Sequence, residues 1–204
     1  WTQLASTTGS SYDYCTKILC DASGNVYVST RSGIFRSTNN GTSWTTITPT
    51  GFSRISDMEL SSTGRLHISG GIFATCGYRY TSNPSTVTSG TWTSASSGYP
   101  ASSVRIELGC NGSILYALPS DASYQVPTIY KSIDGGDNWA ATTGQPTAGW
   151  ANQQAWYDLA VDIDGSGNVI VGGLEAYRST DGGTSWGKIA NWVGLAGQYL
   201  HADI

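Results

Sequence analysis

Two carboxylates are placed where they could act on one substrate. Asp57 and Asp158 each stand at the start of a short apolar segment, and Thr16 and Arg105 hold the corresponding position in two further segments of the same kind. Hydrolysis of a glycosidic bond needs one carboxylic acid and one carboxylate that face a common sugar ring. The pair therefore indicates a hydrolytic site. The alternative is that both side chains accept hydrogen bonds from neighbouring connections.

Aromatic side chains gather in the connections that lead into these segments. They are Tyr12, Tyr14, Phe52, Tyr99, Trp150, Trp156, Tyr157, Trp192 and Tyr199. Flat rings stack on the apolar faces of sugars, and the amides of Asn152, Gln153 and Gln154 can hydrogen-bond to hydroxyls. Because Trp150 and Trp156 bracket this polar run, we expect both indoles to be exposed. The predicted ligand-binding residues are Trp150, Trp156, Tyr157, Asn152 and Gln154. In the alternative interpretation, the rings pack between neighbouring sheets.

The composition indicates an all-β protein. Only 12% of the 204 residues are charged, whereas 26 are Gly and 11% are aromatic. Gly, Ser and Thr weaken helices, and Thr, Tyr and Trp suit a pleated, half-buried surface. The net charge of −4 and the scattered Lys and Arg argue against a nucleic-acid partner. No apolar run has the roughly 18 residues of a membrane-spanning helix, and no nucleotide-binding loop is present, so we expect no cofactor.

Internal repeats organise the chain. A Trp followed by small or polar residues recurs at intervals of 43 to 48 residues. These are Trp1, Trp44, Trp92, Trp139 and Trp186. A turn followed by an apolar run precedes each of the last four, at 23–28, 63–68, 111–116 and 166–171. With one apolar segment before each turn and another after the run, every unit is predicted to hold four short strands.

Four antiparallel strands repeated every 40 to 50 residues are typical of a β-propeller blade. We therefore predict an all-β propeller fragment, with units at 12–47, 54–95, 103–142 and 156–189. Residues 1–4 would end a preceding blade, and residues 199–204 would begin the next one. A β-sandwich, the alternative, does not predict a fixed Trp spacing.

Two segments carry a family resemblance. Residues 132–139 and 179–186 read Ser-x-Asp-x-Gly-x-x-Trp, and residues 37–44 differ only by Asn39 in place of the Asp. This motif resembles the Asp box of the sialidase-like (BNR) propellers, which implies a ring of about six to eight blades. The resemblance implies that the box residues hold turns. These are Ser37, Asn39, Gly41, Trp44, Ser132, Asp134, Gly136, Trp139, Ser179, Asp181, Gly183 and Trp186.

The last unit is similar to large secreted Asp-box propellers of the Bacteroidetes type, many of which leave the cell by type IX secretion. The similarity lies in residues 171–186, Trp192 and 199–203. It implies an extracellular or cell-surface location and a longer parent polypeptide. His201 and Asp203 could bind a metal, but we expect a strand with one polar face and no metal. Cys15, Cys20, Cys76 and Cys110 suit an extracellular setting, with their pairing left open.

The family resemblance covers several activities, including sialidases, xyloglucanases and non-catalytic binding proteins. A sialidase needs a cluster of three Arg, and Arg54, Arg79 and Arg105 do not stand at matching positions. We therefore predict a non-catalytic binding or structural propeller of a secreted, cell-surface protein, whose partner is a glycan or a surface protein. The alternative is a glycoside hydrolase, xyloglucanase-like rather than sialidase, that uses Asp57 and Asp158.

Overall fold

The computed structural model describes residues 2–102 and 104–191. Two short 3-10 helices, Ala5–Thr7 and Ser10–Tyr12, precede four antiparallel sheets. Sheet 1 contains β1 (Cys15–Cys20), β2 (Val26–Thr30), β3 (Gly33–Ser37) and β4 (Thr45–Thr46). Sheet 2 contains β5 (Ile55–Leu60), β6 (Leu66–Gly70) and β7 (Gly77–Thr81). Sheet 3 contains β8 (Ile106–Asn111), β9 (Ile114–Pro119), β10 (Tyr130–Ser132) and β11 (Ala140–Ala141). Sheet 4 contains β12 (Ala160–Ile163), β13 (Val169–Gly172), β14 (Ala176–Ser179) and β15 (Gly187–Ala190).

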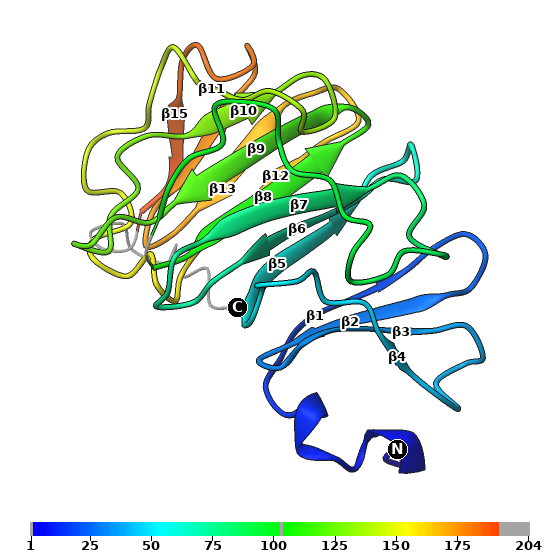
Figure 1. Ribbon diagram of the computed structural model, residues 1–204. Helices are drawn as coiled ribbons and strands as arrows, with labels where there is room; N and C mark the ends of the chain where they lie inside the picture. Colours follow the sequence, from blue (N-terminus) through cyan, green and yellow to red (C-terminus); the bar gives the residue numbers. More distant parts are fainter. Residues whose placement is uncertain (1, 103, 192–204) are drawn as a thin grey trace.

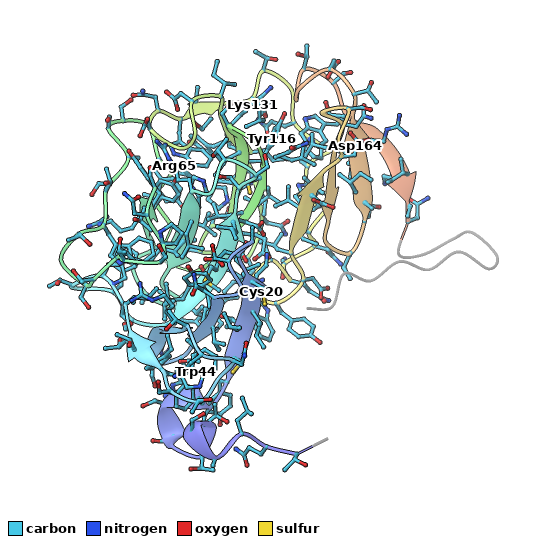
Figure 2. The ribbon with its side chains drawn as sticks, turned by 90° about the vertical axis from the view of Figure 1, so that its right-hand side faces the viewer. Cys20, Trp44, Arg65, Tyr116, Lys131 and Asp164 are labelled. Carbon is cyan, nitrogen blue, oxygen red and sulfur yellow. The ribbon has the colours of Figure 1, made fainter. Side chains whose placement is uncertain are left out.

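Short polar turns join the first two strands of each sheet. Between β12 and β13, Asp164 Oδ1 accepts the backbone N–H groups of Ser166 and Asn168, and Gly167 takes a φ of 81°. Asp164 is labelled at this turn in Figure 2. Asp21 forms the same turn between β1 and β2. The hairpins predicted from the sequence are confirmed, because side chain and glycine fix the chain reversal locally.

The four sheets lie side by side in chain order, from the blue sheet 1 to the orange sheet 4 in Figure 1. Their first strands, β1, β5, β8 and β12, contact one another in that order. Apolar side chains fill the space between successive sheets. The fully buried ones include Tyr27, Ile34, Ile55, Met58, Ile106, Leu108, Leu159 and Val171. The inner sheets therefore bury both faces, as propeller blades do.

Each sheet is also joined to the next at its outer edge. The segment that follows one repeat Trp lies against the next repeat Trp of the chain. Three hydrogen bonds join successive sheets: Trp92 Nε1 to the Ile47 carbonyl (2.7 Å), Trp139 N to the Ser97 carbonyl (3.1 Å) and Trp186 Nε1 to the Gly144 carbonyl (3.1 Å). A corresponding bond, from Trp44 Nε1 to Ser6 Oγ (3.2 Å), joins sheet 1 to the N-terminal segment. Figure 2 shows Trp44 beside the N-terminal segment. The Trp spacing thus reflects a contact between units.

Sheet 2 departs from the predicted four strands. Its fourth strand is reduced to a single bridge between Tyr80 and Thr93. This unit lacks the Ser and Asp of the box, so no tight turn returns the chain beside β7. The prediction of four strands is wrong for this unit, whereas the other three sheets have four.

The antiparallel order gives the sheets two distinct ends. At one end, which we call the mouth end, the first strand of each sheet begins and the second strand ends. The opposite end, which we call the turn end, holds the first hairpin turns and the Ser-x-Asp turns. Side chains from different sheets can therefore meet at the mouth end through the first residues of each first strand and through the connections at that end.

Candidate functional site

A cleft of about 480 Å³ opens at the mouth end. All four sheets contribute to it, through Lys17 on β1, Asp57 on β5, Glu107 on β8 and Ala160 on β12. Trp156 lies in the connection before β12 and completes one wall. The cleft therefore combines charged groups on the first strands with an aromatic ring.

Strand pairing shows which residues share a row in this cleft. Lys17, Asp57, Glu107 and Ala160 pair with the equivalent positions of the second strands, namely Ser29, Ser69, Leu118 and Gly172. The predicted row of Thr16, Asp57, Arg105 and Asp158 is therefore wrong, except for Asp57. Irregularities between residues 15 and 17 and between 55 and 57 shift the register by one residue.

The residues at these irregularities link one sheet to the next. Thr16 Oγ1 donates to the Ile55 carbonyl at 3.0 Å, and Ser56 Oγ donates to the Ile106 carbonyl at 3.1 Å. Thr16 therefore links sheet 1 to sheet 2. Lys17, the next residue, is the one that contributes a charged side chain to the row.

Asp57 is almost fully buried, with 1% of its surface exposed. Its Oδ1 accepts the Met58 N–H at 2.7 Å and lies 3.0 Å from Lys17 Nζ. Its Oδ2 accepts the Leu108 N–H of sheet 3 at 2.8 Å. This carboxylate thus joins sheets 1, 2 and 3, and both of its oxygens are occupied.

Lys17 also pairs with Glu59, which lies two residues beyond Asp57 on β5 and therefore faces the same side of the strand. Burial lowers the pKa of Lys17, but the charges of Asp57 and Glu59 outweigh it and raise the pKa above the ordinary value. Burial, followed by the charge of Asp57, raises the pKa of Glu59 to about 7. The ammonium group is therefore fixed as the positive centre of a buried acidic cluster.

Glu107 was not predicted from the sequence. It is buried, and its Oε2 accepts hydrogen bonds from Arg105 Nη2 at 2.6 Å and Nε at 3.1 Å. Burial and the charge of Asp57 raise the pKa of Glu107 to about 8. Arg105 also donates from Nη1 to the Tyr157 carbonyl at 2.9 Å, which ties sheet 3 to the connection before β12.

Asp158 does not join Asp57 in the cleft. Its side chain is fully buried, and it lies outside the lining of the cleft. The two carboxylates that share a row and line the same space are Asp57 and Glu107. Alternation along β8 could have indicated Glu107, because residues two apart on a strand face the same side.

The predicted ligand-binding aromatics divide into exposed and buried residues. Trp156 and Tyr157 expose 42% and 40% of their surfaces, and their ring centroids lie 5.3 Å apart. Trp150 exposes only 2%, because its Nε1 donates to the Val126 carbonyl and its ring packs edge-on against Tyr177. The expectation that Trp150 is exposed is therefore wrong.

The amides between these aromatics differ as well. Asn152 is exposed and has a positive φ of 43°, whereas Gln154 is half-buried. The backbone carbonyl of Gln154 accepts the N–H groups of Tyr157 and Asp158, both at 2.8 Å. Gln154 thereby fixes the turn that presents Trp156 and Tyr157 at the rim of the cleft.

The other described aromatics of the connections differ in their surroundings: Tyr14 is 73% exposed, whereas Tyr99 packs between sheets 2 and 3. Tyr99 stacks on Tyr78 at 4.7 Å and meets Trp139 edge-on at 5.3 Å. Tyr12 lies 4.9 Å from Phe35. The predictions made for Trp1, Trp192, Tyr199, His201 and Asp203 fall outside the described residues.

The Ser-x-Asp turns hold their own backbone. Asp134 Oδ1 accepts a hydrogen bond from Ser132 Oγ at 2.8 Å and the N–H groups of Asp137 and Asn138 at 3.1 and 3.0 Å. Hydrogen bonds, first from Asn138, lower the pKa of Asp134 to about 2. Asp181 and Asn39 accept equivalent backbone hydrogen bonds at 2.9 Å. All three turns lie at the turn end, away from the cleft.

Within residues 2–102 and 104–191, no group of His, Cys, Asp and Glu is arranged to hold a metal ion. The same residues include no helix that is long and apolar enough to cross a membrane. Cys15, Cys20, Cys76 and Cys110 are all free thiols.

Comparisons with known proteins agree on the fold. No family model and no curated protein matches the chain. Among solved structures, the GH74 xyloglucanase from Xanthomonas campestris aligns with a TM-score of 0.56 at 23% identity, over 83% of this chain and 28% of that one. YCF48 from Cyanidioschyzon merolae aligns with a TM-score of 0.55 at 15% identity, over 91% and 58%. The extracellular domain of BT4673 from B. thetaiotaomicron aligns with a TM-score of 0.64 at 13% identity, over 95% and 23%.

These likenesses concern architecture, since the identities are low. The chain spans 22% to 58% of the length of the first three structures that it matches. In this chain, sheets of three or four antiparallel strands are stacked in chain order. The chain is an all-β protein that forms blades of a β-propeller.

Proposed function

We propose that this chain is part of a non-catalytic, ligand-binding propeller of the Asp-box (BNR) family, on a secreted protein exposed at the cell surface. Its ligand is a glycan or a surface protein, which it binds at the mouth end through Trp156, Tyr157 and Asn152. The units 12–47, 54–95, 103–142 and 156–189 would be blades of a larger ring. The similarity of the last unit to type IX secretion cargo supports the extracellular location.

One observation carries the preference for binding over catalysis. The acidic groups that line the cleft already have partners within the protein: Asp57 is bound by Lys17 and two backbone N–H groups, and Glu107 by Arg105, two residues earlier in the chain. A general acid or nucleophile must instead face the substrate. The neighbouring structures include both kinds of protein, since one is a xyloglucanase and another is YCF48, which was solved bound to a D1 peptide.

A glycoside hydrolase is the second candidate, and it would use a different pair from the one predicted. Asp57 and Glu107 share a row and line one cleft, and the pKa of Glu107, raised to about 8, would keep it protonated near neutral pH, as a general acid requires. Asp158 would have a structural role because it lies outside the cleft.

Incubation with plant, host and microbial glycans and with surface-protein extracts separates these candidates. Retention without new reducing ends, weakened by Trp156→Ala and Tyr157→Ala, supports the binding function. Release of reducing ends that Asp57→Asn and Glu107→Gln abolish would establish the hydrolase. If the protein neither retains a ligand nor releases reducing ends, both candidate functions are contradicted.

A further inference from the structure

Four exposed rings form one continuous surface beside the cleft. Tyr124 meets Phe73 at 6.4 Å, Phe73 meets Trp156 at 6.0 Å, and Trp156 meets Tyr157 at 5.3 Å between ring centroids. They come from three connections, β6–β7, β9–β10 and the one before β12, all at the mouth end. Phe73 and Tyr124, which expose 53% and 37%, were not among the predicted residues. We call these four residues the aromatic platform.

The backbone holds two of these rings in a strained conformation. Phe73 and Tyr124 have φ values of 53° and 58°, a region that bulky side chains rarely adopt. Hydrogen bonds hold each residue there: Phe73 N–H donates to Val104 at 2.8 Å, and the Tyr124 carbonyl accepts the Ala155 N–H at 3.0 Å. Strain of this kind persists where the surrounding structure imposes it, and it clusters at ligand sites.

The cleft beside the platform offers paired charges. Lys17 lies 3.0 Å from Asp57 and also pairs with Glu59, and Arg105 lies 2.6 Å from Glu107. A charged ligand would have to compete with the Lys17–Asp57 ion pair and with the hydrogen bonds between Arg105 and Glu107, whereas a neutral one leaves both intact. The chemistry that remains for a ligand is stacking on ring faces, and the connection that carries Trp156 also holds the exposed amide of Asn152.

We infer that the aromatic platform binds a neutral, extended glycan, with successive sugars stacked on Phe73, Trp156 and Tyr157. This inference rests on the proposed ligand-binding function and names its ligand class. The spacing of the rings is comparable with the length of one pyranose unit in an extended chain. Phe73 and Trp156 are inclined by 38°, and Trp156 and Tyr157 by 35°, so these three faces slope gradually, whereas Tyr124 meets Phe73 edge-on at 88° and closes one end of the platform. A proline-rich peptide also docks on aromatic side chains, so it is the occupant that the binding test must exclude.

Glycine substitutions at the strained positions remove a ring without removing the fold. Phe73→Gly and Tyr124→Gly suit the positive φ, so we expect the thermal midpoint to stay close to that of the unchanged protein. Ile133→Ala is the matched control, because Ile133 is 71% exposed but lies in a turn at the turn end. The probes are cellohexaose, mannohexaose and a xyloglucan oligosaccharide, with a hexagalacturonate and a proline-rich decapeptide for comparison. Calorimetry and tryptophan fluorescence report binding.

The expected result is binding of at least one neutral oligosaccharide, weakened about threefold to tenfold by each glycine variant and unchanged by Ile133→Ala. Neutral-glycan binding that the glycine variants leave intact but Glu107→Gln removes would overturn the platform and keep the proposed function. Selective binding of the decapeptide or of hexagalacturonate would also overturn the inference while keeping a ligand-binding function. Binding of none of the probes overturns the inference; retention in the wider glycan and protein panel then decides the proposed function separately.

Discussion

The two ends of the sheets satisfy their carboxylates in different ways. At the turn end, Asp134 and Asp164 accept N–H groups from residues two to four positions further along the chain. At the mouth end, Asp57 accepts an N–H from another sheet and pairs with Lys17 of a third. The turn end is therefore built from local contacts, whereas the mouth end depends on the relative position of the sheets. Local sequence patterns therefore predict the contacts of the turn end, but they do not predict the contacts between sheets at the mouth end.

The largest effect should follow from removing the carboxylate shared by three sheets. Asp57→Ala leaves the buried Leu108 N–H without its acceptor and Lys17 without one counter-charge. We expect the free energy of unfolding to fall by about 3–5 kcal/mol, as when one partner of a buried ion pair is removed. Urea unfolding measures it. A loss below about 1 kcal/mol would contradict the proposed role of Asp57 in joining the sheets.

A smaller effect is expected where a turn touches the neighbouring sheet. Gly136 has a φ of 90°, and a Cβ there would lie 1.8 Å from Tyr78 Oη. Gly136→Ala should cost about 3 kcal/mol, because the strained backbone adds to the overlap. Gly167 has a φ of 81° and open space, so Gly167→Ala should cost about 1 kcal/mol. If Gly136→Ala and Gly167→Ala lower the thermal stability equally, the contact between the Gly136 turn and Tyr78 of the neighbouring sheet makes no contribution.

The buried carboxyls of the mouth end should make stability depend on pH near neutrality. The pKa of Glu107 rises from 4.5 to about 8. The folded protein therefore binds more protons than the unfolded chain between these values, and stability is full below the lower pKa and falls as the pH rises to the upper one. The slope for one such group is at most about 1.4 kcal/mol per pH unit.

Glu107→Gln should flatten this dependence, since the amide does not titrate. Urea unfolding at several values between pH 5 and 8 measures the slope in both proteins. A stability that rises with pH in this window, or a slope that Glu107→Gln leaves unchanged, would show that Glu107 does not titrate as described.

The smallest effect is expected at an exposed turn. Asp134→Ala removes the acceptor for the Asp137 and Asn138 N–H groups, which water can then reach. We expect a loss of about 1 kcal/mol at neutral pH, similar to that of a helix N-cap. Because the pKa of Asp134 is lowered to about 2 from 3.8, this contribution is present above the ordinary value and is lost as the pH falls to 2. A loss as large as that of Asp57→Ala would remove the contrast between the two ends.

Local patterns in the sequence predicted most of the fold. Turns such as the one at Asp164 depend on residues a few positions apart, and the Trp spacing reflects a contact that recurs between successive units. The prediction failed for the fourth strand of sheet 2, where the chain keeps Trp92 but lacks the tight turn. The β-propeller fold is confirmed by the arrangement of the sheets and by the solved structures that match it.

The candidate site was harder to predict because it depends on register and on long connections. A one-residue irregularity at Ser56 moves Asp57 into the row of Lys17 and Glu107. Trp150 is buried against Tyr177, a contact that no local pattern indicates. Phe73 and Tyr124 lie in connections from a second to a third strand, which also reach the mouth end. Aromatic residues in these connections are therefore also candidates for the mouth end.

The most direct test of the central claim is one titration of the protein with neutral oligosaccharides, in which hydrogen exchange and the release of reducing ends are followed together. We expect protection in the connections that carry Phe73, Tyr124 and Trp156, with no new reducing ends. Release of reducing ends that Asp57→Asn or Glu107→Gln abolishes would contradict a non-catalytic mouth end. Protection confined to the turn end would contradict its role in binding.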